Sequence, residues 1–324
     1  MTESLVVGVD AGATSTRVAV HTLDGARVGY AKTGAGNPTA HGLAKAVAAV
    51  AVALREALGP LDGARVVASL AGVAGHAEEM VPELARVWAQ LGIPREPRYV
   101  GDVPIAYAAG SPEPDGSLLL SGTGAVAARI VGYELDGLAD GLGWLLGDAG
   151  SGFWIGREAA KAVVAALDRG LPIEALLPEA PGEELVQLVG EHFLGAERPA
   201  TPRAAADRIV RLAQADHMRL ARLSSLVSRA AAAGDPMALE IVGEAADHLV
   251  ASLRRVHVAG PVVLAGSVLT SPGPVRAAVT RLLTGENVMT AGDAAGAAAW
   301  LAACPFLNPE ESKARHPCFT RPAG

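Results

Sequence analysis

The sequence predicts an α/β protein made of two related halves with mixed sheets flanked by helices. Runs of β-branched residues alternate with helical patterns, an order typical of layered α/β domains. A pattern of strand, glycine-rich turn, strand and Asp-Gly turn occurs twice, as VVGVDAGATSTRVAVHTLDG and as LLLSGTGAVAARIVGYELDG. Hydrophobic residues make up 50% of the 324 positions, which is enough for sizeable cores. The alternative is that the repeat represents two ordinary hairpins.

The first of these hairpins spans Leu5 to Val20. Two valine-rich runs flank a turn of small residues, Asp10 to Thr14, whose backbone N–H groups could approach an anion closely. Asp10 could hold a hydrated divalent metal, and Thr14 and Ser15 could donate to phosphate oxygens. The alternative is a purely structural hairpin, in which glycine and aspartate serve only the geometry of the turn.

The rest of the first half predicts a layered α/β domain. Asp102 follows the last expected strand, so it is either the cap of the next helix or a general base that takes a proton from a hydroxyl nucleophile. The turn-rich segment SPEPDG marks a domain boundary, which predicts domains of residues 1–114 and 115–292. The expected elements are strands at 26–33, 65–70 and 97–100, and helices at 41–58, 78–91 and 104–109.

The second half predicts a similar arrangement with more helix. Strands are expected at 117–120, 126–131 and 261–264, with a turn at Asp136-Gly137. Helical segments are expected before Asp168, within 172–233, from Asp235-Pro236 onward and at 272–283. A last helix near 293–303 is expected to pack back on the first domain. The polar, proline-rich residues 305–324 are expected to form a loosely ordered tail.

Three stretches of this half fall at strand ends, where α/β proteins place ligands. Ser121 to Ala125 forms a second nest of backbone donors, with Thr123 able to bind a phosphate oxygen. Trp144 and Asp148 lie in a glycine-dense stretch and could bind a sugar, or they could be a core tryptophan and a helix-capping aspartate. A flat adenine or ribose could lie against Gly266 and Ser267, although a plain strand-to-helix turn is the alternative.

Charge and cysteine content exclude several classes of function. The net charge of −7 argues against a nucleic-acid-binding surface. Two cysteines, Cys304 and Cys318, are too few for a disulfide framework or a four-ligand metal site, so we expect free thiols in a reducing cytosol. No signal peptide and no apolar run long enough to span a bilayer are apparent. The sequence therefore predicts a soluble, cytoplasmic protein that does not bind membranes.

Together, these stretches resemble the sugar kinases of the N-acetylglucosamine kinase type, grouped with the BadF/BadG ATPases in the actin–hexokinase–Hsp70 superfamily. The resemblance implies two ribonuclease-H-like (actin-like ATPase) domains with an interdomain cleft. The turn AGAT differs from the GGGT usual in this family, but Thr14 is kept. The matching stretches are GVDAGATSTRVAV, AGNP, SLAGVAG, GDVPIAY, LSGTGAVA, GLGWLLGDAGSGFWIG and VVLAGSV.

Carried over residue by residue, the resemblance implies ATP and Mg²⁺ as cofactors and a homodimer as the assembly. The substrate would be an amino sugar, N-acetylglucosamine in the first place (with a 6-phosphate product) and glucosamine in the second. Asp102 would be the catalytic base, and Asp10 would hold Mg²⁺ through water. Ala125 stands where some relatives have a serine that contacts the sugar, which leaves the choice of sugar open. The phosphate and adenosine positions would be Gly12, Thr14, Ser15, Thr123, Gly124, Gly266 and Ser267. The sugar positions would be Asn37, Ser69, Gly72, Trp144 and Asp148.

Two other functions compete with the kinase. ATPases of the same family that activate a dehydratase bind an iron–sulfur cluster through cysteines in the middle of the chain, whereas Cys304 and Cys318 lie near its end. Sugar-sensing regulators carry an N-terminal helix-turn-helix, for which no room is expected because the first strand starts at Leu5. A catalytically silent sugar-binding protein is the remaining alternative.

Overall fold

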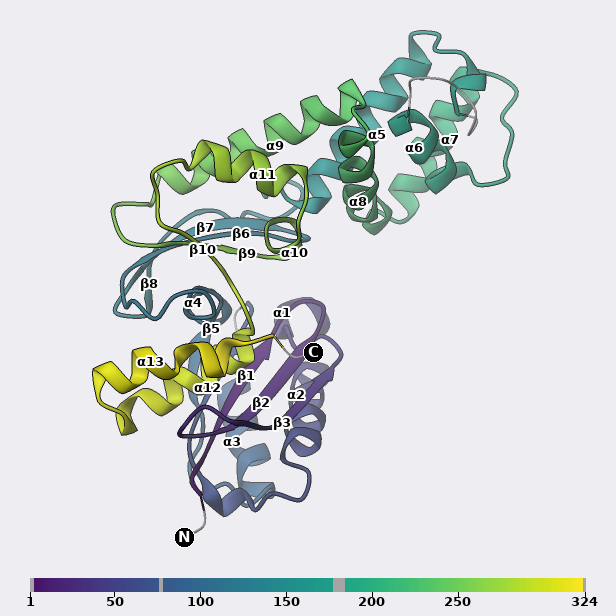
Figure 1. Ribbon diagram of the computed structural model, residues 1–324. Coiled ribbons are helices and arrows are strands. Elements are labelled where there is room, and N and C mark those ends of the chain that lie inside the picture. The colour runs from purple at the N-terminus through teal and green to yellow at the C-terminus, as the bar shows by residue number, and fades with distance from the viewer. Residues whose placement is uncertain (1–2, 76–77, 177–183, 323–324) are drawn as a thin grey trace.

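The computed structural model describes residues 3–75, 78–176 and 184–322. Its framework is a pair of five-stranded mixed sheets, one in each of two domains that lie one above the other in Figure 1. The strand orders are β3-β2-β1-β4-β5 and β8-β7-β6-β9-β10, so corresponding strands occupy the same places in both sheets. The α/β fold with two related halves is thereby confirmed.

The first sheet starts with the hairpin that the sequence predicts. β1 pairs antiparallel with β2 and parallel with β4, while β5 extends the parallel side. Alternate residues of β1, including Val7 and Val9, pack with helices α2 and α3 in one hydrophobic core. The elements are β1 (Leu5–Ala11), β2 (Thr16–Thr22), β3 (Arg27–Thr33), α1 (Pro38–His41), α2 (Leu43–Leu58), η1 (Gly63–Arg65), β4 (Val66–Val73), α3 (Met80–Gln90) and β5 (Arg98–Gly101).

The other face of the first sheet is covered by α12 (Ala294–Ala303), which comes from the far end of the chain. A methyl group on Gly8 would lie only 2.0 Å from the Ala295 carbonyl oxygen, so the strand and the helix touch through their backbones. Helix α4 (Asp102–Ala108) lies between the two sheets: its Ile105 packs in the first domain and its Tyr107 in the second. Asp102 therefore begins a helix that contacts both domains.

The second sheet contains one correction to the expected turns. The Asp136-Gly137 pair lies inside a strand, and the chain turns instead at Gly132 and Tyr133, whose φ angles are 61° and 62°. The short edge strand β10 has only three residues, too few for a sequence pattern. The strands are β6 (Gly116–Ser121), β7 (Ala125–Val131), β8 (Glu134–Asp140), β9 (Val262–Ala265) and β10 (Val288–Thr290).

Helices α9 and α11 cover the outer face of this sheet, and α5 to α8 extend to one side of it (Figure 1). Asp235 caps α9 by accepting from the Ala238 N–H at 2.9 Å, as the sequence predicts. Across the described ranges, none of the helices is both long enough and apolar enough to span a bilayer. The helical elements are α5 (Gly152–Asp168), η2 (Ile173–Leu176), α6 (Glu184–Leu194), α7 (Pro202–Ala215), α8 (Met218–Ala232), α9 (Pro236–Arg254), α10 (Ser267–Thr270) and α11 (Pro274–Leu282).

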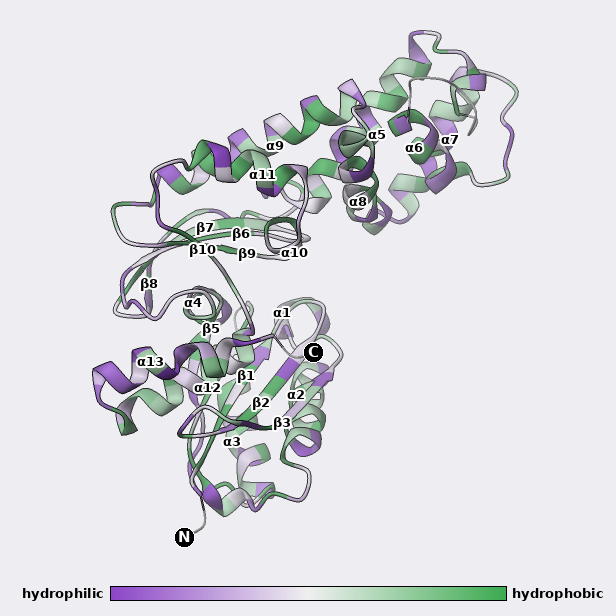
Figure 2. Ribbon diagram, viewed as in Figure 1, coloured by the Kyte–Doolittle hydropathy of each residue, from purple (hydrophilic) through white to green (hydrophobic). Residues whose placement is uncertain are grey.

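The expected loose tail is wrong, because the chain ends in η3 (Cys304–Phe306) and a docked helix, α13 (Pro309–Thr320). Asn308 and Glu311 form a capping box at its start. Phe319 is fully buried and stacks on His21 of β2, with 4.8 Å between ring centroids. The helix is mostly polar in Figure 2, so its few buried residues leave little pattern in the sequence.

Helix α13 also contacts both connections between the domains. The His316 ring nitrogen Nε2 lies 2.6 Å from the Ala108 carbonyl oxygen on the outgoing connection. The Asp293 N–H donates to the Thr320 carbonyl at 2.8 Å on the returning one. A third hydrogen bond, from the Gly292 N–H to the Ala109 carbonyl at 2.9 Å, joins the two connections directly. The two connections are therefore joined to each other and to α13.

Candidate active site

Asp10 lies near the carboxyl end of β1, opposite Arg17 of β2. The Arg17 Nη1 atom is 2.9 Å from the Asp10 Oδ2 atom. Burial raises the pKa of Asp10 to about 6, although the neighbouring guanidinium lowers it, and the charges of Asp102 and Asp293 raise it further. Burial thus disfavours the charged form of Asp10, which lies at the end of a strand, where ligands of α/β proteins bind.

Asp102 is brought to the same edge of the sheet. The register places Ala11, Val73 and Gly101 in one row across β1, β4 and β5, so Asp102 follows directly beyond this row. The interpretation of Asp102 as a helix cap is wrong, because Gly101 is the N-cap of α4. Burial raises the pKa of Asp102 above its ordinary value, more than the nearby N–H groups of Asp102 and Val103 lower it. A carboxylate tuned in this direction suits a general base.

The tip of the first hairpin is tightly closed. The Gly12 N–H donates to the Ser15 carbonyl at 3.0 Å, and Thr14 is exposed at the tip while Ser15 is buried. Ala11 and Ala13 cause no backbone strain, since the described non-glycine residues with positive φ are Tyr133, Asp140 and Asp148. Alanine in place of the usual glycine is therefore compatible with this turn.

The loop after β3 is fastened to this tip. The Gly36 N–H donates to the Gly12 carbonyl at 3.0 Å, and the His41 Nε2 atom lies 2.9 Å from the Ala13 carbonyl oxygen. Between these contacts, Asn37 caps α1 by accepting from the Ala40 N–H at 3.1 Å. Asn37 is therefore beside the hairpin tip, but its side-chain oxygen also has a structural role.

Ser69 and Gly72 take part in the packing of the first domain and offer no free group to a ligand. The Ser69 hydroxyl accepts from the buried Trp88 indole N–H at 2.7 Å, on the face of β4 that meets α3. Gly72 is level with Asp10 in the sheet, but a methyl group there would lie 2.3 Å from Ile105 of α4. The structure does not bring a Ser69 hydroxyl to the edge where Asp10 and Asp102 lie.

The second glycine-rich turn is held by the start of α5. The Gly122 N–H donates to the Gly124 carbonyl at 2.9 Å, and the Gly152 N–H donates to the Gly122 carbonyl at 2.7 Å. The Thr123 carbonyl accepts from the Phe153 N–H at 3.3 Å. This turn occupies the same place in the second sheet as Gly12 does in the first.

The loop at Gly266 and Ser267 lies directly against this turn. Gly266 has a φ of 80°, and a methyl group there would lie 2.2 Å from the Ser121 carbonyl oxygen. The stretches expected to bind phosphate and adenosine in the second domain are therefore neighbours.

Asp148 lies on the other side of the same turn. A methyl group on Gly124 would be 2.8 Å from its Oδ2 atom, and its Oδ1 atom accepts from the Gly143 N–H at 3.2 Å. Its own N–H donates to the Asp140 carboxylate at 2.7 Å, which holds Asp148 at a φ of 55°. Burial raises the pKa of the Asp148 carboxyl, while the N–H groups of Gly143 and Ala125 lower it.

Trp144 is not a core residue, because its exposed fraction is 43%. Its indole stacks on the imidazole of His217, with ring centroids 4.8 Å apart and planes 20° apart. Only part of the indole is therefore available to a ligand, a restriction that the sequence does not reveal.

Three residues of this region go beyond the expectations from the sequence: Arg17, Asp140 and Asp293. Arg17 could have been found by counting pairs outward from the hairpin turn, which places it opposite Asp10. Asp293 caps α12 and pairs with Arg27 at 3.0 Å, and its position near Asp10 depends on the path of the whole chain. The role of Asp140 could not be predicted, because it ends β8 and the sequence indicated a turn within that strand.

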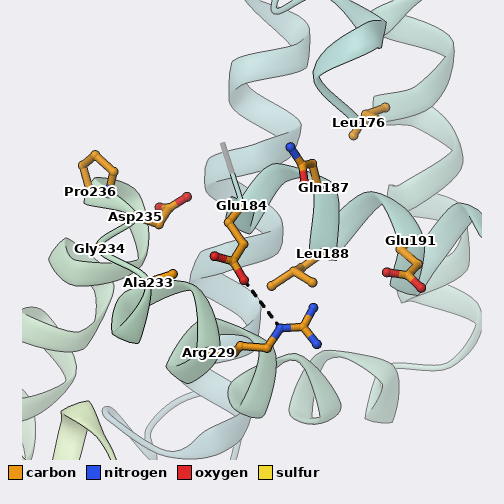
Figure 3. Close-up of a pocket in the computed structure, with 10 residues that line it drawn as sticks. All are labelled: Leu176, Glu184, Gln187, Leu188, Glu191, Arg229, Ala233, Gly234, Asp235 and Pro236. Carbon is orange, nitrogen blue, oxygen red and sulfur yellow. Dashed lines mark ion pairs between the residues drawn. The ribbon is translucent and has the colours of Figure 1, made fainter. Parts of the chain in front are cut away.

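A separate cavity of about 510 Å³ lies in the helical part of the second domain, among α6, α8 and α9 (Figure 3). Its lining carries Glu184, Glu191 and Asp235, and Arg229 points toward Glu184 with 3.6 Å between nitrogen and oxygen. An acidic lining disfavours polyphosphate. We therefore do not assign the nucleotide to this cavity.

The raised pKa of Asp10 predicts that Asp10→Asn is more stable than the wild type at neutral pH. Between about pH 4 and pH 6 the native protein binds more protons at Asp10 than the unfolded chain, so stability falls as pH rises through this window. The asparagine has no such cost, and we expect a gain of up to about 3 kcal/mol at pH 7.5 that disappears near pH 4. Urea unfolding at both pH values measures it.

Asp136→Asn is the matched control, because Asp136 pairs with Arg129 across β7 and β8 on the exposed side of the second sheet. Loss of this exposed ion pair should leave the stability nearly unchanged. An Asp10→Asn variant that is equally or less stable than the wild type at pH 7.5 would contradict the expected burial cost.

The fold is shared with solved structures of low sequence identity. A candidate N-acetylglucosamine kinase from Chromobacterium violaceum is 23% identical, with a TM-score of 0.68, covering 93% of this chain and 100% of that one. A candidate N-acetylglucosamine kinase from Porphyromonas gingivalis is 19% identical, with a TM-score of 0.62 and coverage of 97% and 98%. A ROK family glucokinase from Streptomyces griseus, in complex with glucose and AMPPNP, is 20% identical, with a TM-score of 0.53 and coverage of 94% and 99%.

No match to a curated protein was found. The sequence profile of the BadF/BadG/BcrA/BcrD ATPase family matches residues 7–296, which include both glycine-rich turns, Asp102 and the first residues of α12. This range spans both sheets and nearly all of the helices described above. The chain therefore belongs to the BadF/BadG/BcrA/BcrD ATPase family.

Proposed function

We propose that this protein is an ATP-dependent kinase that phosphorylates a hydroxyl group of an amino sugar. The observation that carries the proposal is the place of Asp102, a buried carboxylate with a raised pKa that starts the helix between the two sheets. Membership of an ATPase family supports the use of ATP. Structural neighbours described as N-acetylglucosamine kinases, and one bound to glucose and AMPPNP, support a sugar as the acceptor.

In the proposed reaction, Asp102 accepts the proton of a sugar hydroxyl as its oxygen attacks the γ-phosphorus of ATP in line with the leaving ADP oxygen. Backbone N–H groups near Gly12 and Thr14 in the first domain, and near Thr123 and Gly124 in the second, would stabilise the phosphate charge. Gly266 and Ser267 would receive the adenosine. Asn37, Trp144 and Asp148 would bind the sugar, while Ser69 and Gly72 support the sheet.

The residues present fit a magnesium ion that arrives with the nucleotide. Within residues 3–75, 78–176 and 184–322, no three histidine, cysteine, aspartate or glutamate side chains cluster as a metal site. Mg²⁺ keeps several waters and commonly takes one or two carboxylates besides substrate phosphates. Asp10 would supply such a carboxylate, through water, and the ion would neutralise phosphate charge. Arg17 must then give up part of its contact with Asp10.

A dehydratase activator remains the competing function within the family. Cys304 directly follows α12, with its sulfur 3.1 Å from the Ser312 hydroxyl, and Cys318 is exposed on α13. Both thiols therefore belong to the C-terminal segment beside the first domain. Anaerobic iron–sulfide reconstitution followed by an absorption spectrum distinguishes the two, since the kinase should bind no cluster.

A coupled assay of ADP release across amino sugars and hexoses tests the proposal. We expect N-acetylglucosamine to give the highest kcat/KM, glucosamine the next, and no release without Mg²⁺. If no sugar stimulates ADP release, the protein is a catalytically silent sugar-binding protein or an ATPase of another kind. The same preparation shows by light scattering whether the protein forms the homodimer that we also propose.

A further inference from the structure

We propose that His217 is a positioning residue for the sugar, acting through the ring of Trp144. The inference rests on the kinase function proposed above, because it concerns how strongly the sugar is held. The helices α5 to α8, which extend to one side of the second sheet, would then influence which sugar is bound and how tightly.

The tip of the loop formed by residues 141–147 is held by aromatic contacts. The indole of Trp144 stacks on His217 at 4.8 Å and 20°, and lies at 5.0 Å and 47° from the ring of Phe153 in α5. The Trp144 carbonyl also accepts from the Arg157 Nη1 atom at 3.4 Å. Trp144 therefore joins the loop to α5 and to the start of α8.

The other apolar side chains of this loop give it no such support. Leu142, Leu145 and Leu146 have exposed fractions of 71%, 67% and 82%. Hydrogen bonds within the loop, from the N–H groups of Leu146 and Gly147 to the Gly143 carbonyl, shape its turn but do not attach it to a neighbour. The place of the tip thus depends mainly on the aromatic contacts.

The base of the loop, in contrast, is fixed. The carboxylate of Asp140 accepts from the N–H groups of Asp148 and Ala149 at 2.7 and 2.9 Å, and Asp148 in turn accepts from Gly143. Asp148 borders the second glycine-rich turn through Gly124. Loss of the aromatic contact at the tip should therefore move Trp144 without displacing Asp148 or the phosphate turns.

His217 is well placed for this role because it immediately precedes α8, which packs along α5 (Figure 1). Its ring covers one face of the indole, and the exposed part of Trp144 is left for the apolar face of a sugar ring. A ring held in one orientation binds its ligand without a further ordering cost. Without His217 the indole can adopt several orientations, so sugar binding has to order it and becomes weaker.

The test compares His217→Ala, His217→Phe and the control His248→Ala. His248 is also an exposed histidine against a tryptophan, with its ring 5.1 Å from that of Trp154 at 72°, but on α9 and away from the loop. The kinetic constants for the sugar and for ATP are measured in each variant. Incorporation of 5-fluorotryptophan then gives one ¹⁹F resonance per tryptophan, with that of Trp144 identified by Trp144→Phe.

We expect His217→Ala to raise KM for the sugar by about threefold to tenfold, with kcat and KM for ATP within about twofold of the wild type. The Trp144 resonance should shift, and the other three should not. His217→Phe, which keeps a stacking ring, should restore most of the sugar affinity, and His248→Ala should leave all the constants unchanged.

An unchanged KM for the sugar in His217→Ala, or an equal rise in KM for sugar and ATP, would overturn the positioning role. A failure of His217→Phe to restore affinity while the Trp144 resonance returns to its original position would overturn it as well. These results are distinct from failure of the proposed function, in which the wild type itself shows no sugar-stimulated ADP release.

Discussion

Asp102→Asn is expected to lower kcat by about 10²- to 10⁴-fold while leaving the affinity for ATP nearly unchanged. The amide has almost the same shape as the carboxyl group but cannot accept the proton of the sugar hydroxyl. The helix should persist, because its cap is Gly101 and not Asp102. Single-turnover phosphoryl transfer and nucleotide binding by calorimetry measure the two quantities separately.

The control for this variant is Asp62→Asn. Asp62 also lies at the start of a helical turn and accepts from the Ala64 N–H at 2.9 Å, but it precedes β4 and is therefore at the opposite end of the sheet. It should leave turnover unchanged. Turnover of Asp102→Asn within about threefold of the wild type would exclude Asp102 as the base.

In the wild type, kcat/KM should fall as the pH drops through the pKa of Asp102, which burial places above its usual range.

Phe319→Ala is expected to destabilise the protein by about 3–5 kcal/mol, the range for loss of a buried aromatic side chain. The ring of Phe319 is fully buried against His21 of β2, and its removal leaves a cavity beneath α13. Burial also lowers the pKa of His21 to about 4, and the Nε2 atom of that ring has no hydrogen-bond partner in the described structure. Water that enters the cavity should therefore raise the pKa of His21 toward its ordinary value.

Phe306→Ala serves as the comparison, because Phe306 belongs to the same C-terminal segment but is 46% exposed. Its cost should be below about 1 kcal/mol. Urea unfolding gives both values, and hydrogen exchange of residues 309–320 shows whether α13 separates first. Equal costs for the two variants would mean that α13 is not docked in solution.

The strands and the two glycine-rich turns could be predicted from the sequence because they depend on local patterns. Runs such as Val6 to Val9 favour strands, and small residues after them favour turns, whichever partner strand is added later. The repeated hairpin pattern also predicted the relation between the two sheets. Asp102 followed from its place at a strand end.

The remaining features depend on contacts that the sequence does not display. Asp136-Gly137 has turn chemistry, yet pairing with β7 keeps it extended within β8. Helix α13 has a polar composition and docks through a few residues such as His316 and Phe319. Likewise, the stacking of Trp144 on His217 joins residues far apart along the chain, and no periodicity marks such a pair.

The position of α12 has a consequence for the order in which the protein folds during synthesis. Residues 116–290 contain every strand of the second sheet, so this domain can fold as a unit as soon as these residues have left the ribosome. The first sheet is made earlier, and on the face that includes Val6, Gly8 and Leu70 helix α4 can cover only a part until residues 294–303 emerge. The domain that is synthesised first is therefore completed last, and part of its apolar face stays exposed to water until the end of synthesis.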